Sequence, residues 1–133
     1  MSAAVARRIL IVDDHAPTRK TIRAMLEADK ENPATIVEAG SGLECLVAVE
    51  KGPPPDLILL DVTMPEMDGF ETCRLLRSKG NQMAIVFVTG KGELADYHKG
   101  REAGADSYLT KPVARGMLKS LVNLFTGPGR KKS

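Results

Sequence analysis

Five short apolar runs alternate with five segments of helical periodicity along the chain. The runs cover residues 9–12, 35–37, 57–60, 85–88 and 108–109. Their spacing of roughly 25 residues leaves room for one helix between successive strands, as parallel βαβ units require. The first, third and fourth runs are apolar at consecutive positions, which predicts strands buried on both faces. The pattern indicates an α/β domain with a five-stranded parallel sheet flanked by five helices.

Helix boundaries and faces follow from local signals. Pro17 suits the first turn of the first helix, and Ser41 with Glu44 forms an S-x-x-E capping box at the start of the second. Residues expected to face inward recur at three- and four-residue spacing: Ile22, Met25 and Leu26; Leu43, Leu46 and Val47; Phe70, Cys73 and Leu76; and Leu118, Leu121, Val122 and Phe125.

The fourth helical segment, residues 93–103, has the weakest pattern. Leu94 and Tyr97 are the main members of a thin apolar stripe, and an internal Gly100 costs about 1 kcal/mol relative to alanine. Gly90 and Gly92 loosen the preceding loop. We expect this helix and loop to be the most mobile part of the domain.

Charge separates the ends of the chain from its middle. A length of 133 residues fits one domain, interpreted as residues 8–126 between an N-terminal tail at 1–7 and a basic tail at 127–133. The net charge is +2, whereas residues 9–129 hold 14 basic and 17 acidic side chains. A basic face and stacking aromatics are both missing, so we expect no nucleic-acid binding.

Apolar content argues against export and membrane insertion. No apolar run approaches the roughly 20 residues of a membrane-spanning helix, and residues 1–8 lack the core of a signal peptide. We therefore expect a cytoplasmic protein. Cys45 and Cys73 lack metal-ligand spacing and are interpreted as reduced, small apolar core residues.

Polar residues that carry chemistry follow four of the apolar runs. Asp13 and Asp14 follow the first, Asp61 the third, Thr89 the fourth and Lys111 the fifth. Because parallel strands end at one edge of a sheet, these side chains should converge. Each has a simpler explanation alone: helix capping for the paired acids, turn formation for Asp61 and Thr89, and a solvated charge for Lys111. None of these explains the convergence.

Three carboxylates in one pocket favour a bound cation. Two unit charges 4 Å apart repel by about 4 kcal/mol at an effective dielectric constant of about 20. Mg²⁺ suits Asp14 and Asp61 with a backbone carbonyl, and Asp13 acting partly through water. With Lys111 and Thr89 added, the pocket matches a phosphoryl group, for which Asp61 is the candidate nucleophile.

Four stretches resemble the receiver domains of bacterial two-component response regulators. They are ILIVDD at 9–14, LILLDVTMPEMDGFE at 57–71, VTG at 88–90 and AGADSYLTKP at 103–112, and the resemblance spans about residues 8–125. It implies the strand order 2-1-3-4-5 known from the chemotaxis regulator CheY.

The resemblance also implies roles for individual residues. Asp61 would be the phosphoacceptor, and Lys111, joined to Pro112 by a cis bond, would contact the phosphoryl group. The implied magnesium site comprises Asp13, Asp14, Asp61 and the backbone of Thr63. Thr89 and Tyr108 would form a switch pair, in which the hydroxyl moves to the phosphoryl group and the ring turns inward. Partners would meet the face formed by the fourth helix, fifth strand and fifth helix.

Four positions distinguish this sequence within the resemblance. Thr63 and Lys91 occupy positions that tune phosphate lifetime in the family, and Gly90 and Gly100 stand where alanine is more usual. We expect the two glycines to let the unphosphorylated domain visit the active arrangement more readily.

The favoured hypothesis is a phosphorylation-dependent switch without an output domain. Asp61 would accept a phosphoryl group from a histidine kinase or phosphotransfer protein, with slow self-dephosphorylation and no enzymatic turnover. A shuttle or sink that passes the phosphoryl group on, and a receiver-like module that is never phosphorylated, are the alternatives. A D-x-D phosphatase is disfavoured because Thr63 stands where such an enzyme has its general acid.

Overall fold

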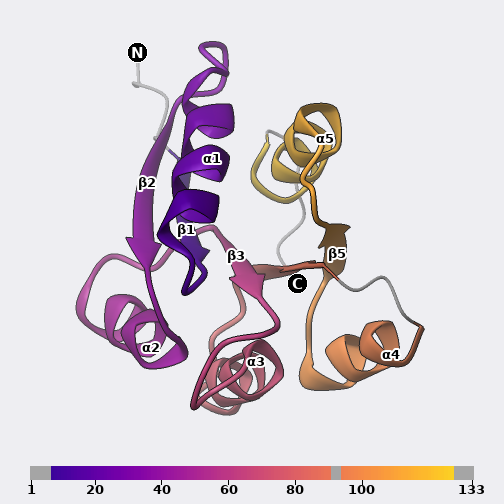
Figure 1. Ribbon diagram of the computed structural model, residues 1–133. Coiled ribbons are helices and arrows are strands. Elements are labelled where there is room, and N and C mark those ends of the chain that lie inside the picture. Colours follow the sequence, from indigo (N-terminus) through magenta and orange to yellow (C-terminus); the bar gives the residue numbers. More distant parts are fainter. Residues whose placement is uncertain (1–6, 91–93, 128–133) are drawn as a thin grey trace.

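The fold is a single parallel sheet with helices on both sides (Figure 1). The computed structural model describes residues 7–90 and 94–127, and for residues 94–96 the backbone alone. The elements in chain order are β1 (Arg7–Val12), α1 (Ala16–Glu27), β2 (Ala34–Ala39), α2 (Gly42–Lys51), β3 (Leu57–Asp61), α3 (Gly69–Ser78), β4 (Ala84–Thr89), α4 (Leu94–Ala103), β5 (Ser107–Thr110) and α5 (Arg115–Thr126). The strands lie in the order β2-β1-β3-β4-β5, which confirms the predicted fold class and strand order.

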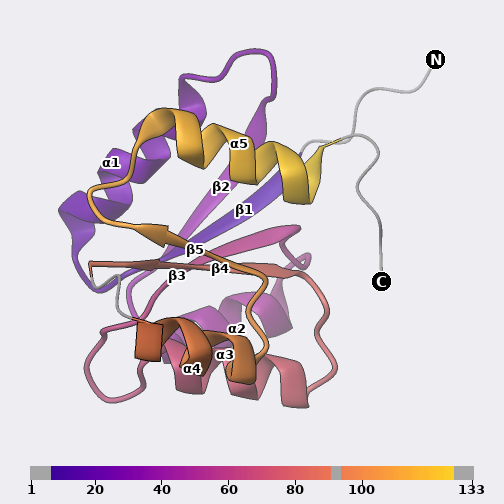
Figure 2. The same cartoon turned by 90° about the vertical axis from the view of Figure 1, so that its right-hand side faces the viewer.

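Two hydrophobic cores lie on opposite faces of the sheet. Figure 2 shows α1 and α5 on one face and α2, α3 and α4 on the other. Alternate residues of one strand serve different cores: Ile9 and Ile11 pack with α1 and α5, while Leu10 and Val12 pack with α2 and α3. Burial on both faces therefore explains why the central strands are apolar at consecutive positions.

The strand register aligns the carboxyl ends of the four strands that carry the predicted site. Val12 lies opposite Leu60, which places Asp13 beside Asp61 one residue further on. Thr89 lies opposite Thr110, so that Lys111 follows directly at the same edge. The predicted convergence thus results from register and not only from topology.

The prediction for the inner face of α2 is partly wrong. Leu43 and Val47 are 63% and 42% exposed, whereas Cys45 and Val49 are buried. The helix carries apolar residues on both faces. The face with Gly42 packs inward, so closely that a Cβ at this position would collide with Thr72. Half of the predicted capping box is confirmed, since the Ser41 hydroxyl accepts a hydrogen bond from the Glu44 N–H at 3.0 Å. The Glu44 carboxylate accepts the N–H of Gly40 at 2.7 Å.

The N-terminal boundary of the domain lies slightly earlier than predicted. Arg7, assigned to the tail, is the first residue of β1, and its guanidinium donates to Asn32 and Asn123 at 2.8 and 3.0 Å. Residues 1–6 and 128–133 of the predicted tails lie outside the described residues, as do Lys91 and Gly92. The expected mobility around α4 stays a prediction. Among the helices that the structure describes, none is long and apolar enough to cross a membrane.

Candidate functional site

Three carboxylates meet at the carboxyl edge of the sheet. Asp13 and Asp61 are buried, with 3% and 6% exposure, and Asp14 beside them is exposed. One carboxylate oxygen from each lies within 4.8 Å of the others. The structure therefore brings together the acidic residues that the sequence predicts to converge.

Lys111, which is distant from these acids in sequence, forms hydrogen bonds with two of them. Its Nζ donates to Asp13 Oδ2 at 2.9 Å and to Asp61 Oδ1 at 3.4 Å. Its backbone N–H bonds the Thr89 carbonyl at 2.8 Å, which continues the β4–β5 pairing, and its peptide bond to Pro112 is cis as predicted. Lys111 is thus a half-buried ammonium held over the acidic pair.

The electrostatics of Asp61 differ from those of an ordinary surface aspartate. Burial, followed by the charge of Asp13, raises the pKa of Asp61 from 3.8 to about 6, although Lys111 and the Thr63 N–H act in the opposite direction. Burial lowers the pKa of Lys111, but its bond to Asp13 and the charge of Asp61 together raise that pKa by more. One ammonium thus compensates the negative charge of Asp61 only in part.

The loop after β3 fixes the backbone of Asp61. Gly69 donates its N–H to the Val62 carbonyl at 2.8 Å, and a Cβ at this position would collide with the Asp61 carbonyl oxygen. Glycine is therefore required for the loop to fold back on the end of β3. Asp68 then caps α3 by accepting the Glu71 N–H at 2.9 Å.

The paired acids do not cap α1. The N-cap residue is His15, whose side chain makes no capping bond, and the carboxylate of Asp13 accepts the His15 N–H at 2.8 Å. The capping alternative for Asp13 and Asp14 is therefore wrong. Asp13 is instead held by hydrogen bonds in the orientation that faces Lys111.

The predicted switch residues lie beside the acidic edge. Thr89 is buried at the end of β4, and Tyr108 is half-buried with its ring 5.6 Å from Phe87 and 5.4 Å from Tyr97. A Cβ at Gly100 would lie 2.8 Å from the Tyr108 hydroxyl and 3.0 Å from the Phe87 ring. Gly100 therefore leaves room for the tyrosine in this position. Its effect on switching stays a prediction.

One contact of the site, made by Arg19, could not be predicted from the sequence. Arg19 of α1 bonds both Glu38 of β2 and the backbone carbonyl of Asp13. In sequence, Arg19 and its neighbour Lys20 are typical of a solvated helix face. Only the packing of α1 against β2 brings Arg19 to the acidic edge.

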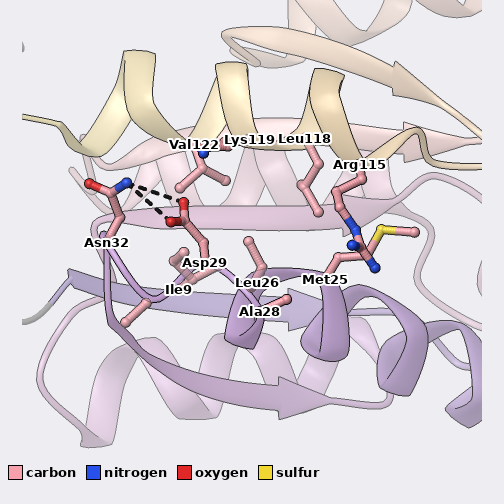
Figure 3. A pocket seen from close by; sticks show the side chains of 11 residues that line it. Ile9, Met25, Leu26, Ala28, Asp29, Asn32, Arg115, Leu118, Lys119 and Val122 are labelled. Carbon is pink, nitrogen blue, oxygen red and sulfur yellow. Dashed lines mark hydrogen bonds between the residues drawn. The ribbon is translucent and has the colours of Figure 1, made fainter.

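A pocket of about 130 Å³ between α1 and α5 contains none of the predicted site residues. Figure 3 shows Asp29 and Asn32 at one end, Arg115 at the other, and Leu26 and Leu118 between them. The acidic edge is identified by its converging charges and not by a deep cavity.

The acidic edge fits a hard divalent cation. Its donors are carboxylate oxygens, one exposed and two buried, and burial with mutual repulsion disfavours their joint ionisation without a cation. Asp13, Asp14 and Asp61 are the side chains that would hold Mg²⁺. The participation of the Thr63 backbone stays a prediction.

The comparison with known families agrees with this geometry. A family model described as the response regulator receiver domain matches residues 9–123. The chain belongs to this family. Curated relatives of this receiver domain include the response regulators MprA of Mycobacterium ulcerans (strain Agy99) and Mycobacterium leprae (strain TN), each 40% identical over 107 residues. These alignments cover 80% of this chain but 44% and 45% of the relatives, so the chain spans about half their length.

Solved structures with the same fold include two instructive receiver proteins. The chemotaxis protein CheY4 of Vibrio cholerae is 25% identical with a TM-score of 0.83, over 91% of this chain and 99% of that one. The receiver domain of the sensor histidine kinase PA1611 from Pseudomonas aeruginosa PAO1 is 26% identical with a TM-score of 0.82, over 92% and 99% of the two chains. That structure holds a magnesium ion coordinated in its active-site cleft.

Proposed function

We propose that this receiver domain is a phosphorylation-dependent switch in which Asp61 accepts a phosphoryl group from a histidine kinase or phosphotransfer protein. The observation that carries the proposal is the convergence of Asp61 with two further acids and Lys111. The Lys111 Nζ lies 3.4 Å from Asp61 Oδ1, and the three carboxylates lie within 4.8 Å of one another. The candidate nucleophile Asp61, the ammonium of Lys111 and carboxylate oxygens that could bind a metal ion are thus next to each other.

The transfer uses the Asp61 carboxylate as nucleophile. One of its oxygens forms a bond to phosphorus while the bond from phosphorus to the donor's histidine nitrogen breaks, and the electron pair stays on that nitrogen. Mg²⁺, when bound, neutralises charge on the phosphoryl oxygens. Lys111 contributes a second positive charge at the same oxygens, and its contact with Asp13 holds it at the pocket.

Signal transmission involves Thr89 and Tyr108. The Thr89 hydroxyl would donate a hydrogen bond to the new phosphoryl group, and Tyr108 would repack in response. A ligand shifts such an equilibrium only when it interacts better with one state than with the other, and the phosphoryl group supplies that difference. The face formed by α4, β5 and α5, turned towards the viewer in Figure 2, is the proposed partner surface. Its helices expose apolar side chains, among them Tyr97 and Met117.

The domain is proposed to lose its phosphoryl group slowly and without enzymatic turnover. Thr63, two residues beyond Asp61, is exposed and has no acidic proton that could assist hydrolysis. Transfer of the phosphoryl group onward to another protein is the alternative use of the same chemistry.

Phosphorylation by acetyl phosphate tests the proposal. The wild-type chain and Asp61→Asn are incubated with and without Mg²⁺, and mass spectrometry measures the adduct. Asp68→Asn is the matched control, because it changes an aspartate of the same loop to a residue that also caps helices well. The proposal expects a Mg²⁺-dependent, base-labile adduct in the wild type and in Asp68→Asn, and none in Asp61→Asn.

Two other outcomes contradict the switch. Rapid multiple turnover of acetyl phosphate supports a phosphatase, and the absence of any adduct on the folded wild type supports an inert interaction module. An adduct that persists in Asp61→Asn would place the phosphoacceptor elsewhere.

A further inference from the structure

Arg19 connects the acidic edge to a separate ion cluster. This residue of α1 is half-buried, with its side chain 18% exposed. Its Nε donates to Glu38 Oε1 at 2.9 Å, while a terminal nitrogen of the same guanidinium donates to the backbone carbonyl of Asp13. One planar group therefore joins α1, β2 and the end of β1.

The Glu38 end of this connection is firmly anchored. Arg23 Nε donates to the Glu38 carboxylate at 2.6 Å and Lys20 Nζ at 3.2 Å, in addition to Arg19. Burial raises the pKa of Glu38, but these hydrogen bonds lower it by more, to about 2. Glu38 is thus ionised throughout the neutral range and provides a fixed acceptor for Arg19.

The Asp13 end of the connection acts on its neighbour. The carbonyl oxygen of Asp13 lies in the same planar peptide unit as the nitrogen and Cα of Asp14. Fixing that oxygen therefore restricts the backbone from which the Asp14 side chain projects. The carboxylate of Asp13 is held independently by Lys111 and the His15 N–H. Asp14 is exposed, and repulsion from two neighbouring carboxylates favours its displacement toward solvent.

We propose that Arg19 is a positioning residue for the divalent-cation site. It holds the Asp13–Asp14 peptide so that the Asp14 carboxylate stays beside Asp13 and Asp61, and it does not touch the cation. The inference rests on the proposed function and assigns to that site a residue from outside its acidic cluster. Outer partners of this kind set metal affinity by orienting the ligands.

Arg23 provides a matched control on the same helix. It lies one turn beyond Arg19 and donates to the same carboxylate, but its second arm bonds the Ile36 carbonyl at 3.0 Å. Methionine at either position keeps most of the aliphatic bulk and removes one cation from Glu38. Only Arg19→Met also removes the bond to Asp13.

The experiment compares Mg²⁺ affinity and stability in the wild type, Arg19→Met and Arg23→Met. Amide chemical shifts followed during a Mg²⁺ titration give the affinity, and urea unfolding in EDTA gives the stability. We expect Arg19→Met to bind Mg²⁺ about 10-fold more weakly. Arg23→Met should stay within about two-fold of the wild type, although both variants lose stability with the Glu38 ion pair. In metal-free protein, Arg19→Met should also shift the amide resonances of Asp14 and His15 more than Arg23→Met does.

Equal Mg²⁺ affinities for the two variants would overturn the inference. Arg19→Lys serves as the second variant if Arg19→Met does not fold. Its ammonium retains the charge beside Glu38 but lacks the guanidinium fork, so stability should recover more than Mg²⁺ affinity. Full recovery of both in Arg19→Lys also contradicts the proposed bridge. A wild-type chain that neither binds Mg²⁺ nor forms the adduct contradicts the proposed function itself, which distinguishes the two failures.

Discussion

Two carboxylates at the same end of the sheet have opposite electrostatic surroundings. Glu38 and Asp61 have side chains only 11% and 8% exposed. Three cations surround Glu38 and lower its pKa to about 2, whereas Asp61 shares one lysine with Asp13 and has its pKa raised to about 6. The cluster at Glu38 has excess positive charge and needs no further ligand. The cluster at Asp61 has excess negative charge, which is the condition for binding a cation and then a phosphoryl group.

Removing the charge at Glu38 should have the largest effect on stability. Glu38→Gln leaves Arg19 and Arg23 beside a neutral amide, so Arg19 loses its ion pair with Glu38 while Arg23 retains only its pair with Glu27. We expect the free energy of unfolding to fall by up to about 3 kcal/mol, the lower end for breaking a buried ion pair, because Glu38 and both arginines are partly exposed. Urea unfolding at pH 7 measures the change. A loss below about 1 kcal/mol would show that the cluster is energetically no different from a surface ion pair.

The corresponding change at Asp61 should have the opposite sign. A pKa raised from 3.8 to about 6 corresponds to a penalty of up to about 3 kcal/mol for the ionised group, at 1.36 kcal/mol per unit. Asp61→Asn removes this penalty but also weakens the contact with Lys111. We therefore expect an increase in stability of about 2 kcal/mol at pH 7 in EDTA, measured by the same urea unfolding.

The pH dependence is the control for this gain. Because Asp61 has a higher pKa in the folded than in the unfolded chain, the folded chain binds more protons between about pH 4 and 6. The contribution of Asp61 to stability therefore decreases as pH rises through that window. The advantage of Asp61→Asn should vanish below pH 4. Glu38 behaves oppositely, since its stabilisation is present above pH 4.5 and is lost as pH falls toward 2. An advantage of Asp61→Asn that is constant with pH would have a cause other than ionisation.

Magnesium should narrow the difference in stability between the wild type and Asp61→Asn. A ligand present at ten times its Kd stabilises the folded state by about 1.4 kcal/mol. We expect the wild type to gain this amount, and Asp61→Asn, with one carboxylate fewer, to gain less. Thermal unfolding with Mg²⁺ or with EDTA measures both. Equal gains in the two proteins would exclude Asp61 from the cation site.

The acidic edge could be predicted from sequence because its residues directly follow apolar runs. Strand order and register then place Asp13, Asp61 and Lys111 together with little dependence on side-chain packing. The inner face of α2 could not be predicted, since Leu43 and Cys45 are both apolar and only the contact at Gly42 decides between them. Periodicity finds a stripe only where the opposite face is polar.

The Glu38 cluster could not be predicted for a different reason. Arg19, Lys20 and Arg23 are all basic residues of one helix, and Glu38 follows in the next strand. Their sequence pattern is that of a solvated helix surface. The difference between the half-buried Arg19 and the exposed Lys20 depends on how α1 rotates against β2, which no local pattern encodes.

The smallest predicted effect on stability comes from removing Lys20 from the ion cluster at Glu38. Lys20 also reaches Glu38, at 3.2 Å, but its side chain is 66% exposed, against 18% for Arg19. Exposed ion pairs are screened by water and salt and need side-chain ordering, so Lys20→Ala should change the free energy of unfolding by less than about 0.5 kcal/mol. Urea unfolding at low and high salt, with Arg23→Met for comparison, measures the difference. A loss in Lys20→Ala as large as that in Arg23→Met would mean that the exposed lysine contributes as much to this cluster as the less exposed arginine.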